Sequence, residues 1–300
     1  MSFSAKKMIE LGVKIADAKV FQQDKTWSKF SHDKVDIGER LVRTIRVLHK
    51  EFPLARPLTA LSIGSSNEPQ FRILEPVFRG GLYLLDIEAG ALNIVNERIG
   101  RQSLDHVKTI VGDYNKIFSD SKKTDLFLSK SLKGNKINLI AMHHSLYYCS
   151  QQNWRVLFDN LYAKILAGQG AMHTVMMTCE DNDPYSTSWL YGHFAAKFFG
   201  CHNDQDITQF KKELAADSLF KSTQVLLKRS RVEFFTDNFE EFMSVVWMIM
   251  LYPGVHKYSY KQKEEITELV YKRFWRLKRP MVQHQDHLVV FRGIKTRGIL

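Results

Sequence analysis

Short apolar runs alternate with amphipathic stretches through the middle of the chain. The runs are almost wholly apolar and lie at 58–63, 82–87, 107–111, 137–142 and 171–177. Continuous apolar runs are typical of strands that are covered on both faces, as in a parallel sheet. Strands that alternate with helices form βαβ units with right-handed crossovers. The pattern therefore predicts an α/β fold with a doubly wound, mostly parallel sheet.

Helical spacing dominates the two ends of the chain. Residues 1–56 are mostly helical in pattern, with Asp36 as a start cap and Pro53 as a stop. Further helices are predicted at about 187–199, 206–216, 238–251 and 259–277, and further strands at 223–235 and 287–291. We expect an N-terminal helical lid at 1–56 and one Rossmann-like domain at 57–300. That domain carries helical insertions at about 187–216 and 238–279, the second before the last strand.

Composition narrows the class of protein. The 300 residues are 44% hydrophobic and 25% charged, which is ordinary for a globular chain. Neither an apolar window of about 18 residues nor a signal peptide is evident, so we expect a cytoplasmic protein without membrane contact. The three cysteines form no CxxC pair, so we expect buried free thiols and no metal site.

The net charge of +11 is concentrated at the two ends of the chain. Residues 1–56 hold 12 basic and 7 acidic residues, and residues 253–300 hold 11 and 4. A basic periphery can attract an anionic substrate or a nucleic acid, and it can equally be solubilising charge.

Ligands of open α/β sheets bind outside the carboxyl ends of the strands, so the residues that follow each strand are the candidates for chemistry. The small residues of Ser62–Pro69 follow the first strand and let a ligand approach the backbone. Asp86 ends the second strand, where a carboxylate can accept hydrogen bonds from both hydroxyls of a ribose. Asp113 follows the third strand and can accept an adenine amino group. Nicotinamide-binding proteins would need GxGxxG after the first strand, and that motif is missing.

This ordered set resembles the class I, Rossmann-like S-adenosylmethionine-dependent methyltransferases over about residues 55–180. The resemblance rests on Leu61–Gly64, Asp86–Ala89, Val111–Asp113, Ile137–His144 and Leu166–Gly170, the last of which resembles the family's turn before strand five. The sequence departs from the family at the three-glycine loop, where only Gly64 remains. Asn138 also stands where Asp is common, and Ala167 replaces the Pro of the turn.

The resemblance implies the sheet order 3-2-1-4-5-7-6 and the cofactor S-adenosyl-L-methionine. The residues expected to bind the cofactor are Gly64, Ser65, Ser66, Glu68, Asp86, Ile87, Asp113, Tyr114 and His143.

Two adjacent histidines, His143 and His144, are the catalytic candidates because they end the fourth strand. One of them could act as a general base, since imidazole titrates near neutrality. Strand alternation places them on opposite sides, so at most one should face the acceptor. The residues expected to contact the methyl acceptor are Trp27, Tyr147, Tyr148 and Tyr185.

Three functions stay open. The first is methyl transfer to a small-molecule acceptor by in-line displacement, within a pocket built by the helical additions. The second is methylation of RNA, supported by the basic ends and by Lys272–Arg279, where basic and aromatic residues interleave. The third is a non-catalytic binding protein of the same fold, which the reduced glycine loop permits.

Overall fold

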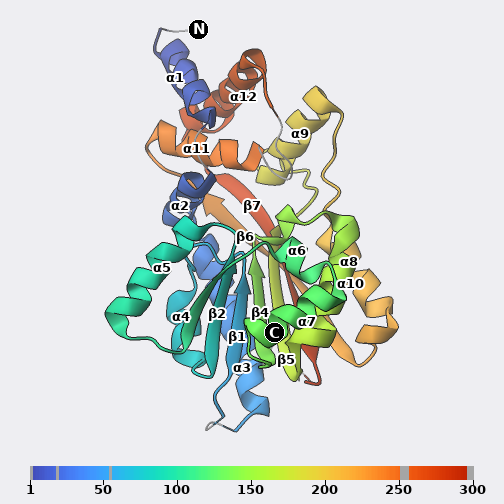
Figure 1. The fold of residues 1–300 in the computed structure, drawn as a ribbon. Coiled ribbons are helices and arrows are strands. Elements are labelled where there is room, and N and C mark those ends of the chain that lie inside the picture. The colour runs from blue at the N-terminus through green and yellow to red at the C-terminus, as the bar shows by residue number, and fades with distance from the viewer. Residues whose placement is uncertain (1–2, 18–19, 54–55, 251–256, 296–300) are drawn as a thin grey trace. The chain divides into compact units, whose positions relative to one another are not determined.

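The computed structural model describes residues 3–17, 20–53, 56–250 and 257–295, and they fold into two compact units (Figure 1). We call the described residues within 37–176, 205–228 and 286–300 the sheet unit, and those within 1–36, 177–204 and 229–285 the helical unit. The strands are β1 (Thr59–Ile63), β2 (Gly81–Asp86), β3 (Val107–Val111), β4 (Ile137–His143), β5 (Leu166–Met177), β6 (Thr223–Phe234) and β7 (Met281–Arg292).

The helices divide between the two units. Those of the sheet unit are α3 (Asp33–Glu51, from residue 37 onward), α4 (Phe71–Val77), α5 (Ala89–Gln102), α6 (Tyr114–Phe118), α7 (Ser121–Lys130), α8 (Gln151–Asn160) and α10 (Ile207–Ala216). Those of the helical unit are α1 (Phe3–Lys14), α2 (Val20–Phe30), α9 (Thr187–Phe199), α11 (Phe239–Met250) and α12 (Tyr260–Arg273). The division between residues 36 and 37 lies within α3. Of the two predicted insertions, α9, α11 and α12 lie in the helical unit, whereas α10 lies in the sheet unit.

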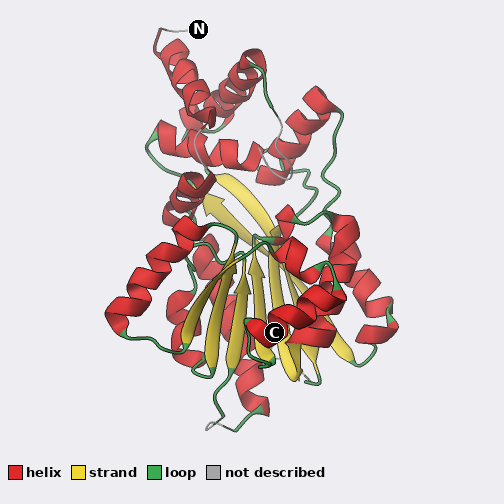
Figure 2. Cartoon of the chain, viewed as in Figure 1, coloured by secondary structure: helices red, strands yellow, loops and turns green. Residues whose placement is uncertain are grey.

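The seven strands form one sheet in the order β3-β2-β1-β4-β5-β7-β6, which confirms the predicted order. Figure 2 shows the strands of this sheet in yellow. The pairs β2–β3, β1–β2, β1–β4 and β4–β5 are parallel. In the shared register Ser62 lies opposite Leu84 on one side and Ala141 on the other. The carboxyl ends of β1, β2 and β4 therefore meet at one edge, as the doubly wound prediction requires.

Alternating side chains of each strand supply two separate cores in the sheet unit. Leu82 and Leu84 pack with α3, α4 and α5 on one face, whereas Tyr83 and Leu85 pack with α6, α7, α8 and α10 on the other. Both faces are buried, which explains why these strands are apolar in continuous runs rather than alternately.

Aromatic side chains fill the core of the helical unit. Trp247 is fully buried, and its indole Nε1 donates to the carbonyl oxygen of Gly12 at 2.8 Å. The hydroxyl of Tyr258 donates to the carbonyl oxygen of Met250 at 3.0 Å. Each buried polar tip thus has a partner, as buried aromatics with polar groups require. In the described part of the chain, no helix is long and apolar enough to cross a membrane.

Two predicted boundaries are wrong. Gly168–Gly170 does not form a turn, because β5 already begins at Leu166; α8 ends at Asn160 and a π-helical turn over Leu161–Ile165 leads directly into the strand. Strand β7 begins at Met281 rather than at residue 287. Three residues of its first half, Gln283, Gln285 and Asp286, are polar but buried, and Gln285 Nε2 donates to the carboxylate of Asp36 at 2.7 Å.

Three residues differ from their predicted roles or surroundings. Asp36 does not cap its helix, which begins at Asp33; its carboxylate instead accepts hydrogen bonds from Gln285 and Ser230. Cys149 is buried as expected, whereas Cys179 is half-buried and Cys201 is exposed.

Candidate cofactor and acceptor site

The carboxylate of Asp86 holds two loops at the carboxyl edge of the sheet. Its Oδ2 accepts a hydrogen bond from the backbone N–H of Ser66 at 2.7 Å, and its Oδ1 accepts one from Glu88 N–H at 2.8 Å. Asp86 therefore does not cap α5, whose N-cap is Glu88. Each carboxylate oxygen has a second lone pair, so the carboxylate can accept further hydrogen bonds from a ligand.

The loop after β1 takes backbone conformations that glycine adopts most readily. Ser66 has a φ of 47° and Glu68 a φ of 49°, both in the left-handed region, and Gly64 has a φ of 66°. This conformation costs a non-glycine residue about 1–2 kcal/mol. The loop thus has a glycine-like geometry although Ser66 and Glu68 are not glycines, and Asp86 helps to hold it through Ser66. Non-glycine residues in such conformations concentrate at functional sites.

Close packing accounts for the one glycine that remains in this loop. A Cβ atom on Gly64 would lie 2.2 Å from the Cβ of Ser145, which follows β4. Ser145 is itself tied to β1, because its hydroxyl donates to the carbonyl oxygen of Ile63 at 2.9 Å. The loops after β1 and β4 therefore touch where a ligand of this fold would lie.

Asp113 and Tyr114 lie at the start of α6. The Oδ1 of Asp113 accepts a hydrogen bond from Asn115 N–H at 3.0 Å, and its other oxygen lies 3.7 Å from Lys116 Nζ. The hydroxyl of Tyr114 donates to the carbonyl oxygen of Ser145 at 2.6 Å. Burial, followed by the neighbouring Cys149, raises the pKa of Tyr114, so this side chain stays a neutral donor.

Several predicted site residues border the same edge. Ser65 and Glu68 are buried in the β1–α4 loop, and Glu68 Oε1 accepts a hydrogen bond from Gln70 N–H at 3.0 Å. Ile87 follows β2 and is 69% exposed, and Tyr148 is 63% exposed. Exposed apolar side chains beside polar loops are typical of ligand sites, although single ones also occur on ordinary surfaces.

The two predicted catalytic histidines have different surroundings. His143 Nε2 lies 3.2 Å from Nδ1 of His173, a fully buried residue on β5. His144 Nδ1 lies 3.1 Å from the hydroxyl of Tyr147, and its backbone has a φ of 55°. Both rings are half-buried.

Trp27 and Tyr185 belong to the helical unit. Trp27 is buried in the core of that unit, where its indole Nε1 donates to Asp33 at 3.0 Å and its ring stacks on Phe234. The guanidinium of Arg279 lies 4.0 Å from the ring centre of Tyr185. In this conformation both rings are engaged within their own unit, and their contact with an acceptor stays a prediction.

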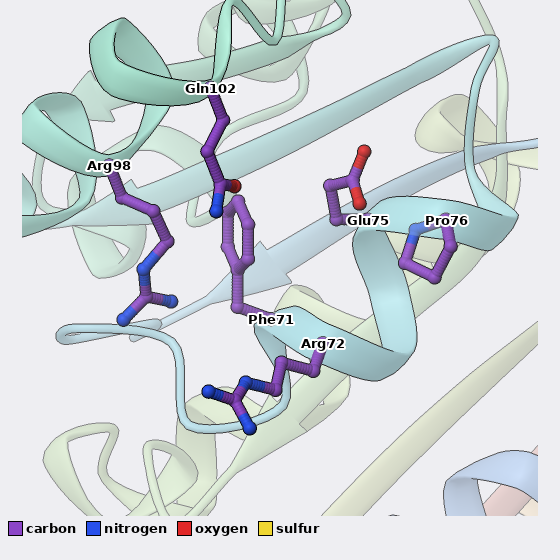
Figure 3. A pocket seen from close by; sticks show the side chains of 6 residues that line it. All are labelled: Phe71, Arg72, Glu75, Pro76, Arg98 and Gln102. Carbon is purple, nitrogen blue, oxygen red and sulfur yellow. The ribbon is translucent and has the colours of Figure 1, made fainter.

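A groove of about 270 Å³ lies between α4 and α5 and is a separate feature (Figure 3). It is lined by Phe71, Arg72, Glu75, Pro76, Arg98 and Gln102. Arg98 lies over the ring of Phe71 at 4.8 Å, and Glu75 pairs with Arg79. None of the predicted site residues lines this groove, so the groove does not mark the candidate site.

Three residues at the carboxyl edge of the sheet or inside the sheet are not predicted from the sequence. Ser145 faces Gly64, while His173 and His287 lie inside the sheet on β5 and β7. A polar residue within an apolar strand, such as His173 in Ala171–Met177, is the signal that indicates a buried polar contact. The sequence does not show its partner, because His287 is 114 residues away.

Comparison with known proteins supports the fold. No family model matches the chain, and no curated protein matches it. Among solved structures, the YcgJ protein of Bacillus subtilis is similar with a TM-score of 0.51 and 11% identity, covering 85% of this chain and 99% of that chain. A protein of Bacillus halodurans assigned as a methyltransferase also gives 0.51 and 11%, covering 83% of this chain and 98% of that chain.

At this identity the likeness concerns the fold alone. Together with the strand order, it shows that the chain has the Rossmann-like fold of class I methyltransferases.

Proposed function

We propose that the protein is an enzyme that binds S-adenosyl-L-methionine and transfers its methyl group to a small-molecule acceptor. A lone pair of the acceptor forms a bond to the methyl carbon while the carbon–sulfur bond breaks and its electron pair stays on sulfur. The protein's part is to align the two groups and to exclude water.

The arrangement around Asp86 carries the proposal. A carboxylate ends β2 beside a loop whose backbone is held in glycine-like conformations, and Gly64 brings that loop against Ser145. We assign Asp86 to the ribose hydroxyls, Asp113 to the adenine amino group, and Gly64, Ser65, Ser66 and Glu68 to the remainder of the cofactor. Ile87, Tyr114 and His143 complete the proposed cofactor site.

The acceptor end of the site is proposed at β4. Where the acceptor carries a proton, His143 or His144 removes it. Tyr147 and Tyr148 border these histidines and supply aromatic surface for the acceptor, and Trp27 and Tyr185 are further candidates for that contact.

The surroundings of the basic stretch favour a small molecule over RNA. In Lys272–Arg279, Arg273 lies over the ring of Trp189, Arg279 lies over Tyr185, and Lys272 pairs with Glu268. Phe274 is fully buried. A single-stranded nucleic acid needs aromatic faces and cations that are free for stacking and for phosphates. Here Lys272, Arg273 and Arg279 serve contacts within the helical unit, whereas Arg276 and Lys278 are exposed.

Calorimetric titration of the wild type and Asp86→Asn with S-adenosylhomocysteine tests the cofactor site. We expect the variant to bind about 10- to 150-fold more weakly, because hydrogen bonds to a charged group contribute about 1.5–3 kcal/mol. Asn keeps one oxygen, which serves one of the two loop amides, so thermal unfolding of the variant checks that the loops persist.

Asp105→Asn is the matched control, because it removes the same charge from an exposed position before β3. Equal affinities for the wild type and both variants would refute the assignment of Asp86.

Tight RNA binding with a steep salt dependence would favour RNA as the acceptor instead.

A further inference from the structure

Three imidazole rings form a line through the sheet unit, from the carboxyl end of β4 to the interior of β7. His143 Nε2 lies 3.2 Å from His173 Nδ1, and His173 Nε2 lies 3.3 Å from His287 Nδ1. His173 is 0% exposed and His287 is 1% exposed. Both ring nitrogens of His173 thus face another histidine.

The central ring is neutral. Burial lowers the pKa of His173 well below its usual value, and the neighbouring His143, His287 and Arg40 lower it further. A neutral imidazole has one N–H donor and one nitrogen acceptor. The line can therefore adopt only two proton orders, with all donors directed toward His287 or all directed toward His143.

The charges at the two ends of the line select one order. His287 shares a small cavity with Arg40, Lys228 and Thr44, so positive charge lies near this end. The other end lies at the carboxyl edge of the sheet, where Asp86 ends β2 and Glu68 lies in the loop after β1. Lone pairs are stabilised near cations and N–H groups near anions. Both charge distributions favour donors that point toward His143.

We propose that His287 and His173 are positioning residues that hold His143 with its ring proton on Nδ1, so that His143 presents an N–H donor rather than a base. His287 donates from Nδ1 to His173, and His173 donates from its own Nδ1 to Nε2 of His143. The ligand group suited to this donor is a hydrogen-bond-accepting oxygen of the methyl acceptor, such as a carboxylate or carbonyl oxygen. The role of His143 rests on the proposed function only for the identity of that ligand. If a base is used, it is then His144.

Long-range proton–nitrogen correlation spectra of protein labelled with ¹⁵N-histidine test the proton order directly. Single His→Gln variants at the three positions assign the signals. We expect Nδ1 to be protonated and Nε2 to be bare in His143 and His173, at pH 7 and without cofactor. Protonated Nε2 in His143 and His173 would overturn the proposal, and so would an even mixture of the two forms.

His287→Phe, which removes both ring nitrogens at this position, tests whether His287 controls the proton order at His143. We expect His143 to lose its single tautomer, while His202→Phe, the same change at an exposed histidine, leaves the spectra of all three rings unaltered. A His143 signal unchanged by His287→Phe would remove the positioning role. If that variant does not fold, the wild-type spectrum still decides the proton order. S-adenosylhomocysteine affinity, measured separately, tests the proposed function, so either idea can fail without the other.

Discussion

The carboxylate that ends β2 and the histidines that cross β4, β5 and β7 are two polar regions of one sheet, and they are stabilised in opposite ways. Asp86 is half-buried, and backbone N–H groups of the loops on both sides hold its charge. His173 is fully buried, is held by two other side chains, and stays uncharged. Backbone amides can compensate a charge at the edge of a sheet, whereas its interior admits a polar ring only as a neutral link.

This difference in stabilisation predicts how each region responds to substitution and to pH. The loops at the edge depend on backbone geometry, so steric substitutions should damage them most. The histidine line depends on protonation, so its contribution to the free energy of unfolding should change with pH. The predictions below test these two dependences from the largest effect to the smallest.

Gly64→Ala should cause the largest loss. The new Cβ would lie 2.2 Å from the Cβ of Ser145 and would also occupy a left-handed backbone position. Overpacking costs about 1–3 kcal/mol, and the backbone conformation costs about 1–2 kcal/mol more. We expect S-adenosylhomocysteine binding to become undetectable by calorimetry and the free energy of unfolding to fall by several kcal/mol.

The double variant Gly64→Ala with Ser145→Gly separates the two causes of that loss. It removes the clash and leaves the backbone cost, so part of the stability should return. No recovery in the double variant would contradict the packing argument.

Acid should destabilise the sheet unit through His173. Its pKa is lower in the folded state than in the unfolded chain, where an imidazole has a pKa of about 6.5. The unfolded chain therefore binds more protons as the pH falls below that value, and the free energy of unfolding decreases. The slope from this one group reaches at most about 1.4 kcal/mol per pH unit.

Urea unfolding at pH 7, 6 and 5 of the wild type and of His173→Gln measures this dependence. The variant should be less stable at pH 7 and should lose less stability on acidification. Parallel curves for the two proteins would show that His173 does not stay neutral in the folded state.

Tyr114→Phe should have a smaller effect. It removes the hydrogen bond from the phenol to the carbonyl oxygen of Ser145, a bond of 2.6 Å between buried groups. We expect a loss of about 0.5–1.5 kcal/mol in the free energy of unfolding. Weaker S-adenosylhomocysteine binding should accompany it, because Ser145 packs against Gly64. Wild-type stability and affinity in this variant would show that the Tyr114 hydroxyl on α6 does not support the site.

Tyr148→Ala should have the smallest effect on stability. The ring is 63% exposed, and surface substitutions usually change the free energy of unfolding by less than about 0.5 kcal/mol. Cofactor affinity should stay at the wild-type value, and only acceptor binding should weaken. A large loss of S-adenosylhomocysteine affinity would place Tyr148 at the cofactor instead.

The sheet could be predicted from sequence because its strands are apolar on both faces. The runs at 58–63, 82–87, 107–111 and 137–142 each correspond to a strand within one residue at either end, and the strand order is as expected. The start of β7 could not be predicted, since its polar residues are buried by partners such as Asp36 that lie far away in the chain. Gly168–Gly170 was misassigned because glycines suggested a turn where the backbone continues as a strand.

Candidate site residues could be found where local order places them, directly after a strand. Asp86 and Gly64 are of this kind. His173 and His287 are not, because a line of three rings depends on the register of strands that are distant in sequence. The same holds for Ser145, whose contact with Gly64 exists only once β1 and β4 pair.

The measurement that tests the central claim most directly is calorimetric titration of the wild-type protein with S-adenosyl-L-methionine, S-adenosylhomocysteine and a nicotinamide dinucleotide. The account predicts saturable, one-site binding of both sulfur compounds at micromolar concentration and none of the dinucleotide. A folded protein that binds neither sulfur compound, or that prefers the dinucleotide, would contradict it.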